Sequence, residues 1–145
     1  MRRVRIEDLK KVYEVESLSF KEPYPLFLLY TFYWISPDLF FVAEKRDTGD
    51  IIGYIIGVIR KSFLGHIVSL AVHPKHRRRG VATSLMKRLE GEFIKRGVKA
   101  LRLEVRVSNT VAREFYLKCG FLESYIIPGY YGDGEACVVM YKRVA

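Results

Sequence analysis

Apolar residues recur along the chain at two spacings, and the change from one spacing to the other predicts its helices and strands. A short N-terminal strand precedes residues 9–18, whose apolar side chains follow helical spacing. Residues 25–36 are apolar on nearly every side, which predicts a second helix that ends before Pro37. Such a helix is either part of the core or the lining of a substrate opening or partner surface.

The middle of the chain is rich in residues that favour strands. Two such runs within residues 39–61 flank the turn sequence "DTGD", which predicts a hairpin. The run "HIVSLAVHP", residues 66–74, contains few polar residues and predicts a central strand. Residues 99–109 alternate, so Arg102, Glu104 and Arg106 are expected on the face opposite the apolar side chains.

Two further helices and two strands complete the predicted order. Residues from Gly80 to about Arg96 place apolar side chains on one helical face, and Gly97 is a typical stop. Ser108 or Asn109 is expected to cap a short helix through Lys118. Residues 120–144 predict two strands joined by a loop. The order is that of an α/β protein, with a mixed sheet and helices on its faces, in a single domain of residues 1–145.

Composition narrows the classes of partner and compartment. The net charge of the 145 residues is +9, which favours anionic partners such as cofactor phosphates, RNA or ribosomes. The two cysteines have no metal-ligand spacing, so we expect no metal and reduced thiols. The N-terminus lacks the apolar segment of a signal peptide, and the longest apolar run is too short to span a bilayer. We expect a cytoplasmic monomer or weak dimer without membrane association.

One segment carries recognisable chemistry. In "AVHPKHRRRGVATSL" a strand ends, a basic turn follows, and a glycine opens a helix. The unpaired N–H groups of a helix N-terminus bind anions, and a glycine lets a phosphate approach the backbone. A protein that reads a nucleic-acid duplex would spread its basic residues along a face. The segment therefore predicts a site for a pyrophosphate, with no specific nucleic-acid binding.

Several motifs resemble those of the GNAT N-acetyltransferase family. "RRRGVA" matches the signature Arg/Gln-x-x-Gly-x-Gly/Ala through Arg77, Gly80 and Ala82, and "LEVRVSNTVAREFYLKCGF" resembles the family's second cofactor segment. Within the family the chain most resembles protein N-terminal acetyltransferases of the RimI and NatA catalytic-subunit types. "EPYPLF" resembles their "ENY" loop and "YYGDGEACVVM" their "YYADGEDA" segment. Pro23 departs from the usual Asn, which leaves the preferred substrate residue open.

The resemblance implies a fold, a cofactor and the residues that hold it. The fold would be a mixed, mostly antiparallel sheet of six to seven strands, splayed at the cofactor site, with about four helices. Acetyl-CoA would bind along the predicted central strand of residues 66–74, where one backbone N–H would also stabilise the oxyanion. The expected cofactor contacts are Leu70, Ala71, Val72, Arg77, Arg78, Arg79, Gly80, Val81, Ala82, Thr83, Asn109 and Tyr116.

The resemblance also implies catalytic roles. An α-amino group has a pKa of roughly 8, against roughly 10.4 for lysine, so it needs only a weak base. Glu104 is the candidate base, and the alternative is an ion pair with Arg102 or Arg106. His66 would hold a water or be structural. Tyr116 would protonate the thiolate or be a core aromatic.

The substrate side is expected in two tyrosine-bearing loops. Glu22 would bind the substrate ammonium or act as base, and its alternative is a solvated loop charge. Tyr24, Tyr130 and Tyr131 would wall the peptide groove. The predicted function is acetylation of protein N-termini, and ribosome association of these substrates stays open. The alternatives are a lysine or small-amine acetyltransferase of the same fold and a non-catalytic basic module that binds RNA or ribosomes.

Overall fold

The computed structural model describes all 145 residues and contains seven strands and four α-helices. The sheet order is β1-β2-β3-β4-β5-β7-β6, in which β4 and β5 are parallel and the pairs β1–β2, β2–β3, β5–β7 and β6–β7 are antiparallel. This confirms the predicted mixed, mostly antiparallel sheet and the central position of the strand predicted within residues 66–74. The strands are β1 (Arg2–Arg3), β2 (Phe40–Glu44), β3 (Ile51–Arg60), β4 (Leu64–Val72), β5 (Ala100–Arg106), β6 (Leu122–Ile127) and β7 (Cys137–Arg143), and the helices are α1 (Leu9–Ser19), α2 (Leu26–Ile35), α3 (Val81–Lys95) and α4 (Thr110–Lys118).

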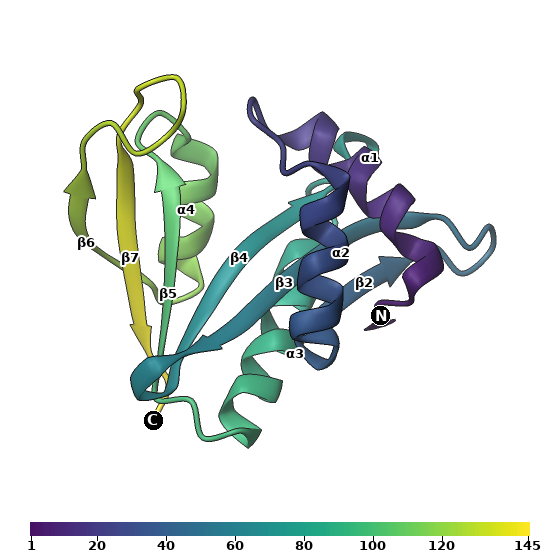
Figure 1. Cartoon of the computed structure of the whole chain (residues 1–145), viewed down its shortest axis with the longest axis horizontal. Helices are drawn as coiled ribbons and strands as arrows, with labels where there is room; N and C mark the ends of the chain where they lie inside the picture. Colours follow the sequence, from purple (N-terminus) through teal and green to yellow (C-terminus); the bar gives the residue numbers. More distant parts are fainter. The chain divides into compact units, whose positions relative to one another are not determined.

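The chain forms two compact units, and the first comprises residues 1–58 and 67–96. In its β2–β3 pair, Phe40 and Val42 lie opposite Ile56 and Tyr54 and belong to the core beneath α1 and α2. Phe41, on the other face, lies under the guanidinium of Arg88 from α3. Strand alternation thus gives each face its own helices, with α1 and α2 on one side and α3 on the other (Figure 1).

Two strand glycines bring α3 close to the sheet. A Cβ at Gly57 would lie 2.6 Å from Phe93 and 2.9 Å from Leu89, closer than real side chains pack. At Gly53 a Cβ would lie 3.1 Å from the carbonyl oxygen of Ala71. The apolar stripe predicted for α3 is confirmed, because Leu85, Met86, Leu89 and Phe93 are buried. The missing side chains therefore let the helix rest directly on β3.

Helix α2 is not a buried helix, although its sequence is apolar on all sides. Only Leu29 is fully buried, whereas Phe27, Trp34 and Ile35 are 68%, 70% and 65% exposed. Leu26, Tyr30, Phe32 and Tyr33 are partly buried against the same core as Leu29, so α2 covers the core with one side only. Of the two alternatives for this helix, a position entirely inside the core is therefore excluded.

The second unit comprises residues 59–66 and 97–145. Leu101, Leu103 and Val105 of β5 are buried, while the charged side chains between them are half-buried on the opposite face. The predicted alternation is therefore confirmed. The side chain of Asn109 accepts a hydrogen bond from the backbone N–H of Ala112 at 3.1 Å, which identifies Asn109 as the cap of α4.

Strand β4 pairs with β5 over a short length only. The parallel register joins Leu64, Gly65 and His66 to Ala100, Leu101 and Arg102 and includes no later residue of β4. The backbone of Ile67–Val72 is therefore outside this ladder. Strand β4 thus loses its β5 partner before the segment that is expected to pair with a cofactor.

No helix of the protein is long and apolar enough to cross a membrane.

Candidate active site

The segment between β4 and α3 has the geometry of an anion site. Gly80 precedes the helix with φ +78°, and Arg78 has φ +65°, a conformation that L-residues other than glycine, asparagine and aspartate rarely adopt. Turns that contain such residues point successive backbone N–H groups toward a common point, where anions bind. A Cβ at Gly80 would meet no atom within 4 Å, so this glycine is needed for its conformation or for a ligand.

The first turn of α3 adds further positive charge to this anion-site geometry. The N–H groups of Val81, Ala82 and Thr83 belong to the helix start, where backbone donors have no partner within the helix. No acidic side chain lies in this turn, and Arg78 and Arg79 are exposed beside it. The donors and the helix dipole therefore suit a phosphate or pyrophosphate.

The side chain of Arg77 is held by hydrogen bonds to neighbouring segments of the protein. Its Nε donates to the carbonyl oxygen of Val72 at 2.9 Å, and one terminal nitrogen donates to Ser19 Oγ at 3.2 Å. These bonds tie the basic turn to the end of β4 and to α1. Arg77 therefore shapes the turn, and Arg78 and Arg79 supply the exposed charge.

The second unit holds a compact polar cluster around Glu104. Its Oε1 lies 2.7 Å from His66 Nε2, and its Oε2 accepts a hydrogen bond from Arg102 Nε at 2.7 Å. The contact between His66 and Glu104 was not expected from the sequence, which assigned the two residues separate roles. The ion pair with Arg102 is also present, so the functional and structural interpretations of Glu104 hold together. Arg106 forms ion pairs with Asp133 and Glu135.

The partners of His66 identify its tautomer. Arg60 approaches His66 Nδ1 through Nε at 3.3 Å and a terminal nitrogen at 3.1 Å. A guanidinium only donates hydrogen bonds, so Nδ1 accepts. The ring hydrogen is therefore assigned to Nε2, which donates it to Glu104.

Glu104 stays ionised although it is largely buried. Burial would raise its pKa, but hydrogen bonds from His66 and Arg102 and the charge of Arg102 outweigh burial and lower the pKa below its ordinary value. Its two oxygens retain lone pairs beyond those that accept from His66 and Arg102. The carboxylate is thus a fixed, weakly basic acceptor on the polar face of β5.

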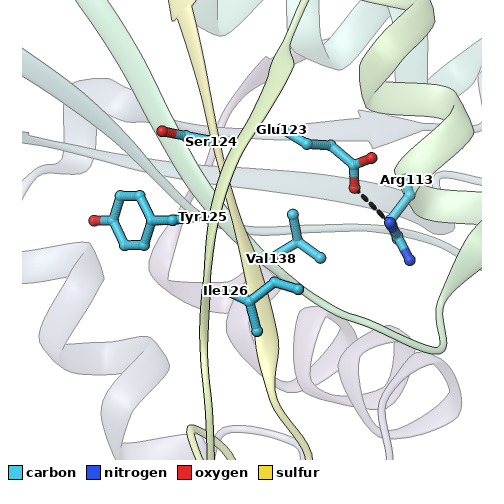
Figure 2. Close-up of a pocket in the computed structure, with 6 residues that line it drawn as sticks. All are labelled: Arg113, Glu123, Ser124, Tyr125, Ile126 and Val138. Carbon is cyan, nitrogen blue, oxygen red and sulfur yellow. Dashed lines mark hydrogen bonds and ion pairs between the residues drawn. The ribbon is translucent and has the colours of Figure 1, made fainter.

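A bulge in β6 brings Tyr125 to the same face. Glu123 pairs with Met140 and Tyr125 with Val139, so Ser124 is the extra residue. Since Val139 also pairs with Glu104, Tyr125 lies on the face of Glu104. Figure 2 shows Tyr125 on one side of β6 and Glu123, with its α4 partner Arg113, on the other; the shallow pocket there is lined by Arg113, Glu123, Ser124, Tyr125, Ile126 and Val138.

Arg102 completes the cluster from β5. Its terminal nitrogen donates to the hydroxyls of Tyr125 and Tyr141 at 3.2 and 3.1 Å. Its guanidinium also lies 5.7 Å from the centre of the Tyr141 ring. Arg102 is therefore held by two tyrosines while it orients Glu104.

The loop between β6 and β7 is braced by Arg106. Its guanidinium donates to Asp133 at 2.8 Å and to Glu135 at 2.9 Å and stacks on the Tyr131 ring at 4.1 Å. Hydrogen bonds from Ser108 and Arg106 lower the pKa of Glu135 to about 2, so this brace is ionised at all physiological pH values. The adjoining Tyr130 is exposed and packs edge-on against Tyr131 at 5.0 Å. The two candidate peptide-binding tyrosines thus come from an ordered loop.

Tyr116 of α4 is half-buried between aromatic neighbours. Its ring lies 5.4 Å from that of Phe115 and 5.9 Å from that of Phe121. Burial, with a smaller contribution from Cys119, raises its pKa above the ordinary value. The phenol is therefore protonated at neutral pH, as a proton donor must be, and the aromatic packing expected of a core residue is present too.

The predicted site residues are divided between the two units. Glu22, Tyr24, Leu70–Val72 and residues 77–83 belong to the first, whereas His66, Glu104, Asn109, Tyr116, Tyr130 and Tyr131 belong to the second. Glu22 is exposed in the loop after α1, and Tyr24 is half-buried against Phe32, with ring centres 5.9 Å apart. Their proposed roles rest on the geometry within each unit.

Comparison with known proteins identifies the family of this chain. The family model for the acetyltransferase (GNAT) family matches residues 9–121. The chain belongs to the GNAT acetyltransferase family. It is 40% identical to an uncharacterized N-acetyltransferase of Methanocaldococcus jannaschii, over 99% of this chain and 90% of the relative. An N-alpha-acetyltransferase of Sulfurisphaera tokodaii is 32% identical, over 97% of this chain and 90% of the relative.

Solved structures give the same family. Ard1 from Thermoplasma volcanium superposes with a TM-score of 0.93 at 30% identity, over 99% of this chain and 96% of that chain. Naa20 from Chaetomium thermophilum, solved with a bisubstrate analogue, gives a TM-score of 0.90 at 31% identity, over 99% of this chain and 85% of that one.

Sequence reasoning missed several residues of this acetyltransferase. Arg60, Tyr125 and Tyr141 gave no motif signal, because only strand pairing brings them to His66 and Arg102. Glu16 did give one, since it is a carboxylate on the apolar stripe of α1, and it is only 2% exposed.

Proposed function

We propose that this acetyltransferase acetylates the α-amino group at the N-termini of proteins, with acetyl-CoA as donor. The observation that carries the proposal is the ionised Glu104, held by His66 and Arg102 with a lowered pKa. Such a base is too weak to deprotonate a lysine efficiently but suits an amine with a pKa of roughly 8. The similarity to an N-alpha-acetyltransferase over nearly the whole chain supports the same substrate class.

The first unit would hold the cofactor. Acetyl-CoA supplies a thioester whose carbonyl carbon is attacked by the amine and whose thiolate leaves. Gly80, Arg78 and the first turn of α3 fit its pyrophosphate, because they offer backbone donors, positive charge and no carboxylate. The backbone of Leu70–Val72, outside the β4–β5 ladder, would pair with the pantetheine arm, and one of its N–H groups would stabilise the oxyanion.

Glu104 would accept the proton of the substrate amine. Its position on a strand, with both oxygens already bonded, suits transfer through one ordered water. His66 would keep Glu104 in place through Nε2 and would itself be kept in place by Arg60. In this arrangement His66 and Arg102 orient the base, and Glu104 takes the proton.

Tyr116 would return a proton to the departing sulfur. Its raised pKa means that the phenol carries its proton at working pH. Asn109, which caps α4 and thereby orders the helix that carries Tyr116, would add a polar contact to the cofactor. The helix thus links the cap, the cofactor and the proton donor.

The peptide would be recognised by the tyrosine-bearing loops. Tyr130 and Tyr131 are ordered by the Arg106 brace, and Glu22 is exposed to receive a substrate ammonium. Tyr24 would contact the peptide from the first unit.

A matched pair of peptides tests the proposal. One peptide has a free α-amine and no lysine, and the other has the same sequence with a blocked α-amine and one lysine. We expect turnover of the first only, measured as CoA release and confirmed by the mass of the product. Turnover of the lysine peptide alone would assign the enzyme to lysine acetylation. Salt-sensitive RNA binding without a thermal shift from acetyl-CoA would instead indicate a non-catalytic module.

A further inference from the structure

A buried carboxylate lies in the first unit, outside the cluster of His66 and Glu104. Glu16 of α1 is 2% exposed, and none of the protein's ion pairs includes it. A buried charge without a cationic partner is costly unless hydrogen bonds replace its water. An apolar side chain would fill the same space without this cost, so the bonds that Glu16 makes indicate what it does.

Three donors satisfy this carboxylate. Oε1 accepts hydrogen bonds from the Tyr54 hydroxyl and from Ser69 Oγ, the latter at 3.1 Å. Oε2 accepts the backbone N–H of Tyr24 at 3.0 Å. Burial and the charge of Glu16 raise the pKa of Tyr54 well above its ordinary value, so its hydroxyl stays protonated and donates.

These donors belong to segments with different proposed tasks. Ser69 lies in β4 next to Leu70, where the backbone is expected to hold the pantetheine arm. Tyr24 lies in the loop between α1 and α2, next to Pro23 and Glu22, on the proposed substrate side. This loop has no strand ladder, and the bond to Glu16 fixes the backbone directly at Tyr24, whose ring also packs on Phe32.

We infer that Glu16 is a positioning residue that fixes the substrate-side loop of residues 20–25 to the cofactor-side strand β4. The assignment of this loop to the substrate side rests on the proposed function, whereas the tether itself is defined by hydrogen bonds. Glu16 touches neither the base nor the reacting groups. It sets where Tyr24 and its neighbours stand before a peptide arrives, so its loss weakens peptide binding more than cofactor binding.

The chemistry of the cluster offers three informative variants. Glu16→Leu removes every acceptor of this side chain, including the one that receives the Tyr24 N–H, while Tyr54 and Ser69 still bond each other at 3.0 Å. Glu16→Gln keeps the tether, because its carbonyl oxygen accepts from Tyr24 and its NH₂ donates to the two hydroxyls, which accept as well as donate. Ser69→Ala disturbs the same buried cluster and leaves the bond to Tyr24 intact.

Steady-state kinetics with the free α-amine peptide separate these variants. For Glu16→Leu we expect the peptide KM to rise by about tenfold, since the Tyr24 N–H loses the bond to Glu16 that fixes the loop. The Kd of CoA should change by less than about twofold. Glu16→Gln should restore the wild-type KM, and Ser69→Ala should keep it. A similar rise of KM and Kd in Glu16→Leu and Ser69→Ala would show a merely structural residue and overturn the inference.

Amide hydrogen exchange supplies a readout that needs no activity. In the wild-type protein the Tyr24 amide should exchange slowly for a loop residue, and Glu16→Leu should speed its exchange while Glu16→Gln does not. Fast exchange of Tyr24 in the wild type would overturn the inference even if Glu16→Leu does not fold. A wild-type protein that protects Tyr24 but acetylates no α-amine peptide would refute the proposed function and leave the tether standing.

Discussion

The basic turn before α3 and the cluster around Glu104 show two ways to build a charged site. The first uses backbone N–H groups and exposed arginines, and its specificity lies in the conformations of Arg78 and Gly80. The second uses side chains, with Glu104 held by His66 and Arg102. The backbone site depends on the path of the chain, whereas the side-chain site depends on protonation. Substitutions should therefore damage the two in different ways.

Gly80→Asp should have the largest effect. It places a carboxylate where the cofactor phosphates are proposed to bind, so we expect the Kd of CoA to rise on the order of 1,000-fold. Calorimetric titration measures this. Gly91→Asp is the matched control, because it adds the same charge to an exposed position of α3 with no atom near the new Cβ. Retained CoA affinity in Gly80→Asp would refute the phosphate site.

Glu104→Gln should have the opposite effect to Gly80→Asp, because it should lower turnover and leave CoA binding intact. Removal of a positioned base lowers kcat by roughly 100-fold, while the Kd of CoA stays unchanged. Glu123→Gln, which breaks the surface pair with Arg113, is the control and should keep kcat. Wild-type turnover in Glu104→Gln would move the base to His66 or Glu22.

Tyr116→Phe separates proton donation from aromatic packing. The ring and its contacts with Phe115 and Phe121 remain, so thermal stability should hold, whereas kcat should fall by roughly tenfold because a thiolate leaves fairly readily without a proton. Tyr13→Phe in α1 is the control. An unchanged kcat would leave Tyr116 a core aromatic only.

Arg106→Gln should loosen the loop that carries Tyr130 and Tyr131. The peptide KM should rise by roughly fivefold, and the Kd of CoA should not move. Arg96→Gln, which breaks a surface pair with Glu92, serves as control. Equal KM values for both variants would show that the brace does not support peptide binding.

The smallest effect concerns stability against pH. The pKa of Glu104 is lowered on folding, so its ionised form stabilises the protein above the unfolded pKa of about 4.3, and this contribution is lost as the pH falls through the lower folded pKa. Glu104→Gln should therefore be less stable than the wild type at neutral pH, and the difference should shrink below about pH 4. Urea unfolding across this range measures it; a constant difference would mean that Glu104 is not preferentially stabilised as an anion.

Much of the site could be predicted from local sequence. The turn, Gly80 and the start of α3 are consecutive residues, so their spacing already defines the anion site. The alternation of β5 placed Glu104 on its polar face, and Asn109 stood where a cap is needed. Contacts between residues far apart in the sequence could not be predicted. One example is the contact of Arg102 with Tyr125, which depends on a bulge at Ser124. The apolar sequence of α2 left its position open between the core and an exposed surface, because composition does not say how many sides of a helix meet a core.

The sequence by itself determined the elements, their order, the family resemblance and the turn and helix start proposed to bind an anion, because each depends on residues close together in the chain. Only the tertiary structure decided which charges pair. The lowered pKa of Glu104 depends on His66 and Arg102, and the hydrogen bonds to Glu16 come from Tyr54, Ser69 and the backbone of Tyr24. Hydrogen bonds act only over a few ångströms, and sheet register and helix packing set those distances between residues far apart in sequence.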